Sequence, residues 1–279
     1  KVMVSTLASG NTAHYVGTKD IVMIPSVVDV NGLNRISRTI FSRAAGAICG
    51  MVESKLDTEA GKPLIVASMF GNTTTCVNIA KEVLEEAGYE VLVFHATGTG
   101  GKAMESLIES GMIAAVLDIT TTEWADELVG GVLAAGPTRM DAMSKAKIPA
   151  VIVPGCVDMV NFGERKAVSQ KFEGRNFYIH NPQITLMRTT PEECGQIGRI
   201  IAEKANANSA PVAILNPLKA VSEINGEGGT FYDPEADKAL FNAIHQHADV
   251  EVVDIDDTIN SATFSKACAE KLLAFLAKT

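Results

Sequence analysis

The sequence has few aromatic residues and no excess of basic ones, and these absences exclude several classes of protein. Aromatic residues make up 5% of the 279 and hydrophobic residues 47%, a composition typical of a parallel sheet between helices, not of an all-β sandwich. The formal net charge of −9 argues against non-specific binding to nucleic acids or acidic membranes. An anionic ligand would therefore be held by local backbone N–H groups and a few basic side chains.

A cysteine framework, a signal peptide and a membrane-spanning run are also missing from the sequence. The five cysteines are odd in number and have no metal-binding spacing, so we expect reduced thiols and no metal site. No apolar stretch is long enough to span a bilayer, and no signal peptide is recognisable. These observations predict a cytoplasmic protein without a membrane partner.

Residues 63–110 organise the rest of the chain because they read as two consecutive strand–loop–helix units. Leu64–Met69 and Val91–Phe94 are short apolar runs without helical spacing, as expected for buried parallel strands. Each is followed by a loop rich in glycine or threonine, at 71–75 and 95–102, and then by a helical pattern. The start of a helix can hold an anion, so both loops are predicted to bind a phosphate group. Alternatively, glycine and threonine serve only the geometry of two ordinary turns.

Ligand-binding residues are expected in these two loops and in a third, which follows the apolar strand Ile113–Asp118. The predicted binding residues of the three loops are Gly71, Asn72, Thr73, Thr74, Thr97, Gly98, Thr99, Gly100, Gly101, Lys102, Thr120, Thr121 and Thr122. The 98–102 loop lacks the spacing of a Walker sequence and of the dinucleotide fingerprint, so it does not identify the nucleotide.

His95 and Asp118 are the candidate catalytic residues. His95 ends a predicted strand among glycine and threonine, a position suited to a general acid or base, and an aspartate beside it would orient the imidazole. Asp118 lies at the carboxyl end of its own strand, where open α/β sheets bind ligands. Alternatively, His95 is a core histidine whose ring is hydrogen-bonded within the protein and has no catalytic role.

Strands alternate with helices along the rest of the chain. Apolar runs at 113–118, 149–153, 212–215 and 250–255, separated by helical patterns, predict a doubly wound, Rossmann-like α/β fold with a parallel sheet. Residues 154–163 read as the exit loop of a strand, and two glycines and two polar side chains in this otherwise apolar loop suggest a shaped wall. The next segment, 164–181, lacks periodicity, which leaves a lid, an arm to a second subunit or a surface excursion open.

The first 58 residues are predicted to be the C-terminal part of a separate α/β lobe, and residues 59–279 the Rossmann-like lobe. The chain enters the apolar strand Val2–Thr6 at once, and two short strands with one long helix cannot cover both faces of a sheet. We therefore expect an upstream segment outside this sequence to complete the first lobe. The long helix after Asn34 carries Gly46 and Gly50 on a small-residue face, which predicts a homo-oligomer.

The turn after the first strand resembles the turn at 71–73, because both contain Gly-Asn-Thr. Its predicted ligand-binding residues are Ser9, Gly10, Asn11 and Thr12. We expect this turn to face the ligand from across the cleft between the two lobes.

Several long motifs in the sequence resemble one family. They are STLASGNTAHYVGTKDIVMIPSVVDVNGLN, FGNTTTCVNIAKEVLEEAGYEVLVFHATGTGGKAMESLI, LDITTTEWADELVGGV, DMVNFG, LMRTT and FYDPEAD. These motifs resemble the family that includes the ATP-binding, virus-inhibiting domain of the tomato mosaic virus resistance protein, with bacterial and fungal relatives, and this chain resembles its C-terminal two-thirds. The resemblance implies two Rossmann-like lobes, self-association and ATP as a ligand, but no particular reaction. We expect Mg²⁺ as an ion that accompanies ATP.

The resulting hypothesis is a protein that binds an ATP-like nucleotide or a phosphometabolite at helix N-termini between two lobes. Two alternatives stay open. One is a regulatory or interaction scaffold without activity, and the other is an enzyme that acts on a small organic acid with His95 as the base.

Overall fold

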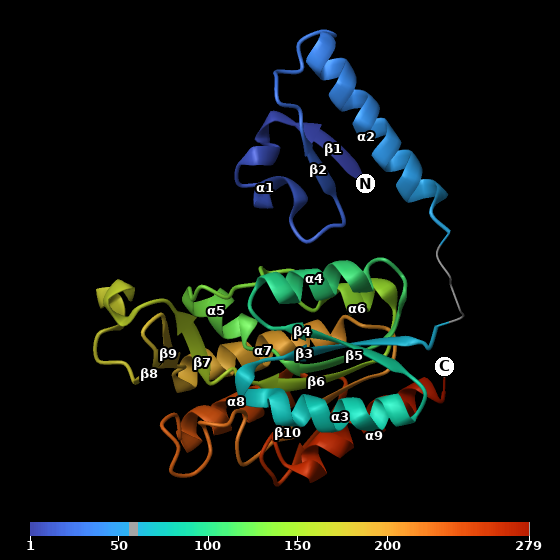
Figure 1. The fold of residues 1–279 in the computed structure, drawn as a ribbon. Coiled ribbons are helices and arrows are strands. Elements are labelled where there is room, and N and C mark those ends of the chain that lie inside the picture. The colour runs from blue at the N-terminus through green and yellow to red at the C-terminus, as the bar shows by residue number, and fades with distance from the viewer. Residues whose placement is uncertain (56–60, 279) are drawn as a thin grey trace. The chain divides into compact units, whose positions relative to one another are not determined.

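The computed structural model describes residues 1–55 and 61–278 (Figure 1). The chain divides into two compact units, Lys1–Gly61 and Lys62–Thr279. The boundary that the sequence predicts after residue 58 lies outside the described residues. Within the described residues, no helix is both long and apolar enough to cross a membrane.

The N-terminal unit is a short parallel pair of strands with one long helix. β1 (Val2–Ser5) pairs in register with β2 (Val22–Pro25), and the short helices η1 (Thr6–Ser9) and α1 (Ala13–Val16) connect them. Helix α2 (Arg35–Glu53) begins at Asn34, whose side chain accepts two backbone N–H groups in a capping box.

The C-terminal unit is built on a six-stranded parallel sheet with the order β11-β10-β6-β5-β3-β4. Its strands are β3 (Leu64–Met69), β4 (Glu90–His95), β5 (Ile113–Thr120), β6 (Ala150–Gly155), β10 (Val212–Pro217) and β11 (Glu251–Ile255). Within this sheet β3 is the first strand in the sequence, β4 pairs with it on one side, and the chain then crosses over so that β5 pairs with it on the other side. The strand order therefore reverses between β3 and β5, which makes this a doubly wound α/β fold and confirms the predicted fold class.

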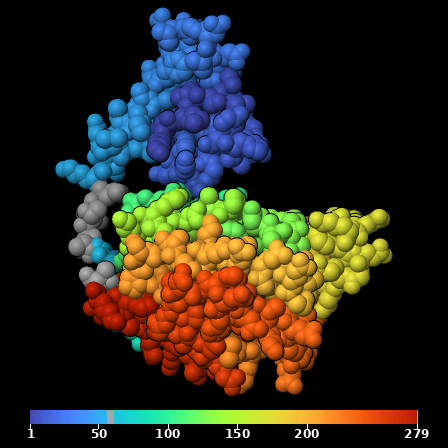
Figure 2. Space-filling model, turned by 180° about the vertical axis from the view of Figure 1, so that it is seen from behind, coloured from blue at the N-terminus to red at the C-terminus, as the bar shows by residue number. Residues whose placement is uncertain are grey.

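Helices cover both faces of this sheet (Figure 1). They are α3 (Thr74–Glu86), preceded by the short turn η2 (Gly71–Thr73), α4 (Thr99–Ile108), α5 (Glu123–Val129), α6 (Asp141–Ala146), α7 (Pro191–Asn206), α8 (Pro234–His247) and α9 (Ala262–Leu276). Helices α3 and α9 pack on one face, and the others contribute to the core of the opposite face. Helices α7 and α8 pack side by side, within the continuous orange and red surface that the rear view shows (Figure 2).

The strands are apolar on both sides because both faces are covered. In β3, for example, Ile65 and Ala67 belong to the core under α3 and α9, whereas Val66 belongs to the core on the other face. This burial explains why the strands appear in the sequence as continuous apolar runs.

A second, antiparallel sheet follows β6, and the sequence analysis did not predict it. Its strands are β7 (Met159–Phe162), β8 (Phe177–Asn181) and β9 (Ile184–Arg188), in the order β7-β9-β8. The expected exit loop at 154–163 therefore contains a strand, and the aperiodic segment 164–181 holds two short 3₁₀ turns, η3 (Arg165–Ala167) and η4 (Gln170–Phe172), before β8. Four- and five-residue strands leave too little alternation for sequence periodicity to detect.

Candidate functional site

A buried hydrogen-bond network joins the carboxyl ends of β3 and β5. Ser68 donates to Oδ1 of Asp118 at 2.6 Å, and its Oγ accepts the backbone N–H of Thr120 at 2.8 Å. The hydroxyl of Thr73, just before α3, lies 2.8 Å from the hydroxyl of Thr120. These fully buried side chains occupy the place where the strand order reverses, the usual position of ligands in such sheets.

Arg139 lies buried behind this network and binds Asp118 through two hydrogen bonds of 2.7 Å. Its Nε donates to Glu123 at 2.7 Å, and Nη1 reaches Glu105 at 3.2 Å. Burial alone lowers the pKa of Arg139, but the three carboxylates raise it well above its ordinary value. Asp118, a candidate catalytic residue, is thus half of an internal ion pair.

Glu123 also occupies the start of α4. Its Oε1 accepts the backbone N–H groups of Gly98 at 2.6 Å and of Gly101 at 3.1 Å, while its Oε2 faces Arg139. A helix start is where an anion is favoured, and here the anion is a side chain of the same chain.

The glycines of this loop are explained by close packing. A Cβ at Gly100 would lie 1.7 Å from the carbonyl oxygen of His95, and one at Gly101 would lie 2.2 Å from Oε2 of Glu123. Gly98 has a φ of +78°, which favours glycine, and a Cβ there would lie 2.8 Å from the carbonyl oxygen of Ala134. Each glycine therefore serves internal contacts of the fold.

The other predicted loop residues divide between the interior and the surface. Thr121 is buried and donates to the carbonyl of Val153 at 3.0 Å, Thr122 is buried as well, and Thr74 donates to the carbonyl of Phe70 at 3.2 Å. Thr99 and Lys102 are exposed on α4.

A cavity of about 490 Å³, named here the strand-end cavity, opens beside the ends of β3 and β4. Its walls come from the loops after β3 and β4, the loop after α5, the antiparallel sheet and residue 223. The residues that line it are Phe70, Gly71, Asn72, His95, Thr97, Val132, Leu133, Asn161, Phe162, Gly163, His180, Gln183, Ile184, Leu186 and Glu223.

The strand-end cavity brings together four of the residues predicted from sequence. Gly71, Asn72 and Thr97 line it, and so does the catalytic candidate His95, whose exposed ring lies 5.7 Å from the ring of Phe70. Asp118 and the predicted residues 98–102 and 120–122 do not line it. Ser9–Thr12 belongs to the N-terminal unit, where Ser9, Gly10 and Asn11 are exposed and Asn11 accepts the backbone N–H of Ala13.

Sequence reasoning indicated a shaped wall at 154–163 but missed the antiparallel sheet to which this wall belongs. The polar residues in the apolar motif DMVNFG, which include Asn161, were a signal that this segment forms a shaped surface. His180, Gln183 and Glu223 carried no such signal, because nothing in the sequence around them ties them to the loops after β3 and β4. Only the tertiary fold, through the β8–β9 hairpin and the loop 218–232, places them beside the loops after β3 and β4.

A second buried polar cluster holds β9 against the loop 218–232. Arg188 donates to Oδ1 of Asp237 at 2.6 Å and to the carbonyl of Phe231 at 2.8 Å. Asp158 accepts the hydroxyl of Ser222 at 2.8 Å, while its Oδ1 has no partner among the described residues. Burial raises the pKa of Asp158 to about 6, although Arg188 acts in the opposite direction.

Comparisons with known proteins place the chain in a family. Residues 62–276 match the C-terminal domain, and residues 1–57 the N-terminal domain, of the uncharacterised protein family UPF0261. The chain belongs to UPF0261. A UPF0261 protein of Clostridium tetani is 55% identical over the whole of this chain and 70% of its own length. A UPF0261 protein of Rhizobium meliloti is 52% identical over 88% of this chain and 61% of its own length.

A plant protein is also similar to this chain. The ToMV resistance protein Tm-1(GCR237) of Solanum lycopersicum is 44% identical over the whole of this chain and 38% of its own length. This UPF0261 chain therefore spans only part of each of these relatives. Among solved structures, a thioesterase domain from the curacin biosynthetic pathway reaches a TM-score of only 0.37 at 11% identity, over 76% of this chain and 91% of that domain.

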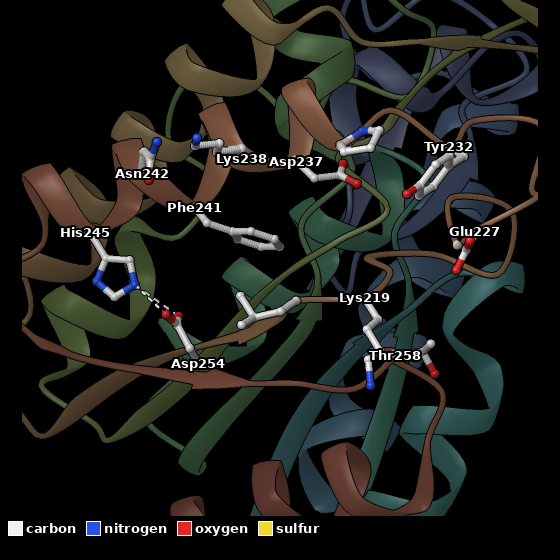
Figure 3. Close-up of a pocket in the computed structure, with 13 residues that line it drawn as sticks. Lys219, Glu227, Tyr232, Asp237, Lys238, Phe241, Asn242, His245, Asp254 and Thr258 are labelled. Carbon is white, nitrogen blue, oxygen red and sulfur yellow. Dashed lines mark hydrogen bonds and ion pairs between the residues drawn. The ribbon is translucent and has the colours of Figure 1, made fainter.

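A further cavity of about 560 Å³, the edge-strand cavity, lies between α8 and the ends of β10 and β11 (Figure 3). Phe241 extends into it from α8, and Tyr232 borders it from the preceding loop. His245 and Asp254 are joined through Nε2 of the histidine at 2.9 Å and 3.0 Å from the two carboxylate oxygens. None of the residues predicted to bind a ligand lines this cavity, so it provides a control site for mutagenesis.

Proposed function

We propose that this UPF0261 chain binds a small organic ligand in the strand-end cavity, with an ATP-like nucleotide or another phosphometabolite as the ligand class. The observation that carries the proposal is the convergence of Gly71, Asn72, His95 and Thr97 on one cavity of about 490 Å³. Its volume is within the range of small-molecule sites, which are mostly apolar with a few placed polar groups. It also lies at the carboxyl ends of parallel strands.

The walls of the cavity suit a ligand with an apolar, planar part and a polar end. Phe70, Leu133 and Phe162 supply apolar surface, and the ring of Phe70 already packs near an imidazole. The amide of Asn72 and the hydroxyl of Thr97 can exchange hydrogen bonds with a ribose or a heterocycle.

The phosphate end of such a ligand belongs near the turn Gly71–Asn72 and not at the start of α4. The amides of Gly98 and Gly101 already donate to Glu123, so a phosphate there would have to displace a buried carboxylate. Gly71 begins the helical segment that continues into α3, and His95 faces the same cavity. A helix start favours an anion, and an N–H of the imidazole ring can donate a hydrogen bond to a phosphate oxygen.

Isothermal titration calorimetry with ATP, AMP and inorganic phosphate, each with and without Mg²⁺, tests this proposal. A Cβ at Gly71 would meet no atom within 4 Å, so Gly71→Leu adds a bulky side chain at the cavity wall without a backbone clash. We expect the wild-type chain to bind at least one nucleotide, Gly71→Leu to bind it at least tenfold more weakly, and His95→Ala to lose on the order of fivefold. The matched control His245→Ala, in the edge-strand cavity, should bind normally. Absence of nucleotide and phosphate binding, or equal binding by Gly71→Leu, would contradict the proposal.

A second candidate, an enzyme that removes a proton from a small organic acid, is favoured by the exposure of His95 to the same cavity. An imidazole with solvent access can take up and release a proton during turnover. Incubation with a panel of 2-oxo acids in D₂O, followed by NMR, would detect exchange of the proton beside the carbonyl. Exchange that His95→Ala abolishes supports this candidate, and exchange at the buffer rate rejects it.

A further inference from the structure

One wall of the strand-end cavity is held by a side chain that does not itself line the cavity. Asp126 of α5 is fully buried, and its Oδ1 accepts the backbone N–H groups of Leu133 and Asn161, each at 3.1 Å. Its Oδ2 accepts the side-chain amide of Asn161 at 2.7 Å. One carboxylate thus receives three hydrogen bonds from two separate segments.

The two segments that meet at Asp126 are both walls of the cavity. Val132 and Leu133 lie in the loop after α5, and Asn161 and Phe162 lie in β7. The N–H of Val132 also donates to the carbonyl of Asn161 at 2.8 Å, which ties the segments directly. The approach is close, because a Cβ at Gly131 would lie 1.9 Å from Oδ1 of Asp126.

We propose that Asp126 is a positioning residue of the strand-end cavity, whose ionised carboxylate clamps the loop 130–133 to β7 and so sets the shape of the ligand site. The assignment of this cavity as the ligand site rests on the proposed function. The clamp itself rests on the three hydrogen bonds.

The charge on this carboxylate has little compensation nearby. Neither the loop 130–133 nor β7 contains an ionisable residue, and Glu123 of the same helix is a like charge. Helix α7, which also packs against α5, contributes Lys204 over the ring of Trp124 at 5.3 Å. Burial is the main cause that raises the pKa of Asp126 to about 6, against the lowering effect of its three hydrogen bonds.

Protonation therefore changes the clamp within an accessible pH range. A carboxyl group that gains a proton becomes a donor at one oxygen, and that oxygen becomes a weaker acceptor, so the group can no longer receive all three N–H donors equally well. Oδ1 of Asn161 has no partner among the described residues, so the amide can turn over and accept the new O–H. The wall then changes its hydrogen bonds while the fold stays intact.

NMR of the ligand-free chain tests the clamp directly. The amide resonances of Leu133 and Asn161 should titrate together with a midpoint near pH 6, and the isosteric Asp126→Asn should abolish this titration. The matched control is Glu127→Gln, since Glu127 follows Asp126 on α5 and accepts the N–H of Gly136 at 3.1 Å without bordering the cavity. The other ionisable groups at the cavity, His95, His180 and Glu223, are separated by repeating the titration in His95→Ala, His180→Ala and Glu223→Gln. Amides that do not titrate, or that titrate unchanged in Asp126→Asn, would overturn the proposal.

Hydrogen exchange and ligand affinity complete the test. We expect Asp126→Ala to speed amide exchange at Leu133 and Asn161 at least tenfold and to weaken ATP binding by a similar factor, whereas Glu127→Ala changes neither. Asp126→Asn lacks the ionised carboxylate, as the protonated wild type does, so at pH 7.5 it should bind ATP about as weakly as the wild type binds it at pH 5, and its affinity should lose the pH dependence near pH 6. If the wild-type chain binds no nucleotide or phosphate, the proposed function fails, yet the NMR titration still decides the clamp. If Asp126→Ala does not fold, Asp126→Asn carries the comparison.

Discussion

The carboxylate of Glu123 accepts the amide N–H of Gly98 at 2.6 Å, so the start of α4 holds an anion that the chain itself supplies. The same side chain bridges this loop to Arg139, which is buried with it. A glycine-rich loop at a helix start is a valid signal for anion binding. In this fold it binds an internal carboxylate.

Removing that carboxylate should create a small anion site. In Glu123→Ala, the amides of Gly98 and Gly101 and Nε of Arg139 lose their acceptor, and we expect a loss of about 3 to 5 kcal/mol in the free energy of unfolding. Formate can replace the missing group, so it should raise the melting temperature of the variant and leave the wild type unchanged. Thermal unfolding at increasing formate concentration measures this. Equal responses of variant and wild type would show that the anion position has collapsed.

Gly100 and Gly71 should differ sharply in their tolerance of a side chain. Gly100→Ala places a Cβ 1.7 Å from a backbone oxygen of His95, so we expect it to cost about 3 kcal/mol or more of stability. Gly71→Ala meets no atom within 4 Å and should change stability by no more than about 0.5 kcal/mol. Urea denaturation of both variants provides the measurement. If Gly100→Ala is as stable as the wild type, the close approach of α4 to β4 is wrong.

The buried Asp158 should make the chain less stable as the pH rises from about 4 to 6. Its pKa in the folded state is raised to about 6, mainly by burial, so the folded state binds the proton more tightly than the unfolded state does. The stability that this group adds is present below its unfolded pKa and is lost as the pH passes through its folded pKa. The difference between the pKa of Asp158 in the folded state and in the unfolded state corresponds to a free energy on the order of 3 kcal/mol.

Asp158→Asn isolates this contribution from the other titrating groups. Arg188 and Asp237 face Asp158 with opposite effects on its pKa and remain in the variant. We expect the difference in unfolding free energy between variant and wild type to shift in favour of the variant between pH 4.5 and pH 7. A difference that does not depend on pH would contradict the raised pKa.

Self-association through α2 remains a prediction for the N-terminal unit. Along this helix a Cβ at Gly46 or Gly50 would meet no atom within 4 Å, and Val52 is 77% exposed and Ile36 47%. Apolar surface of this kind favours a partner, at about 25 cal/mol for each Å² covered. Sedimentation equilibrium should show a dimer that Val52→Asp weakens, with Lys238→Ala on α8 as the control. A monomer at high micromolar concentration would contradict this prediction.

Much of the fold follows from the sequence, because its signals are local. A run such as Leu64–Met69 is apolar throughout since both faces of the sheet are covered, and Asn34 marks a helix start through its own side chain. The order of these elements along the chain, together with the preference for right-handed crossovers, leads to a doubly wound sheet. The short strands β7, β8 and β9 are stabilised by pairing with one another, so they left no such local trace.

The sequence also indicated which loops would meet at the carboxyl ends of the strands, since parallel strands all point the same way. It could not indicate what those loops would bind. Glu123 reaches Gly98 across 25 positions of the chain, and Arg139 reaches Asp118 across 21, so only the folded packing decides that these polar groups satisfy each other. The cavity walls likewise depend on Asp126 and Asn161, which are 35 positions apart. The conformational preference of a residue depends on its neighbours in the sequence, so it can be predicted locally. The hydrogen-bond partner of a buried donor depends on the tertiary structure. An unpaired buried donor costs free energy, and any part of the chain that the fold brings close can supply the missing acceptor.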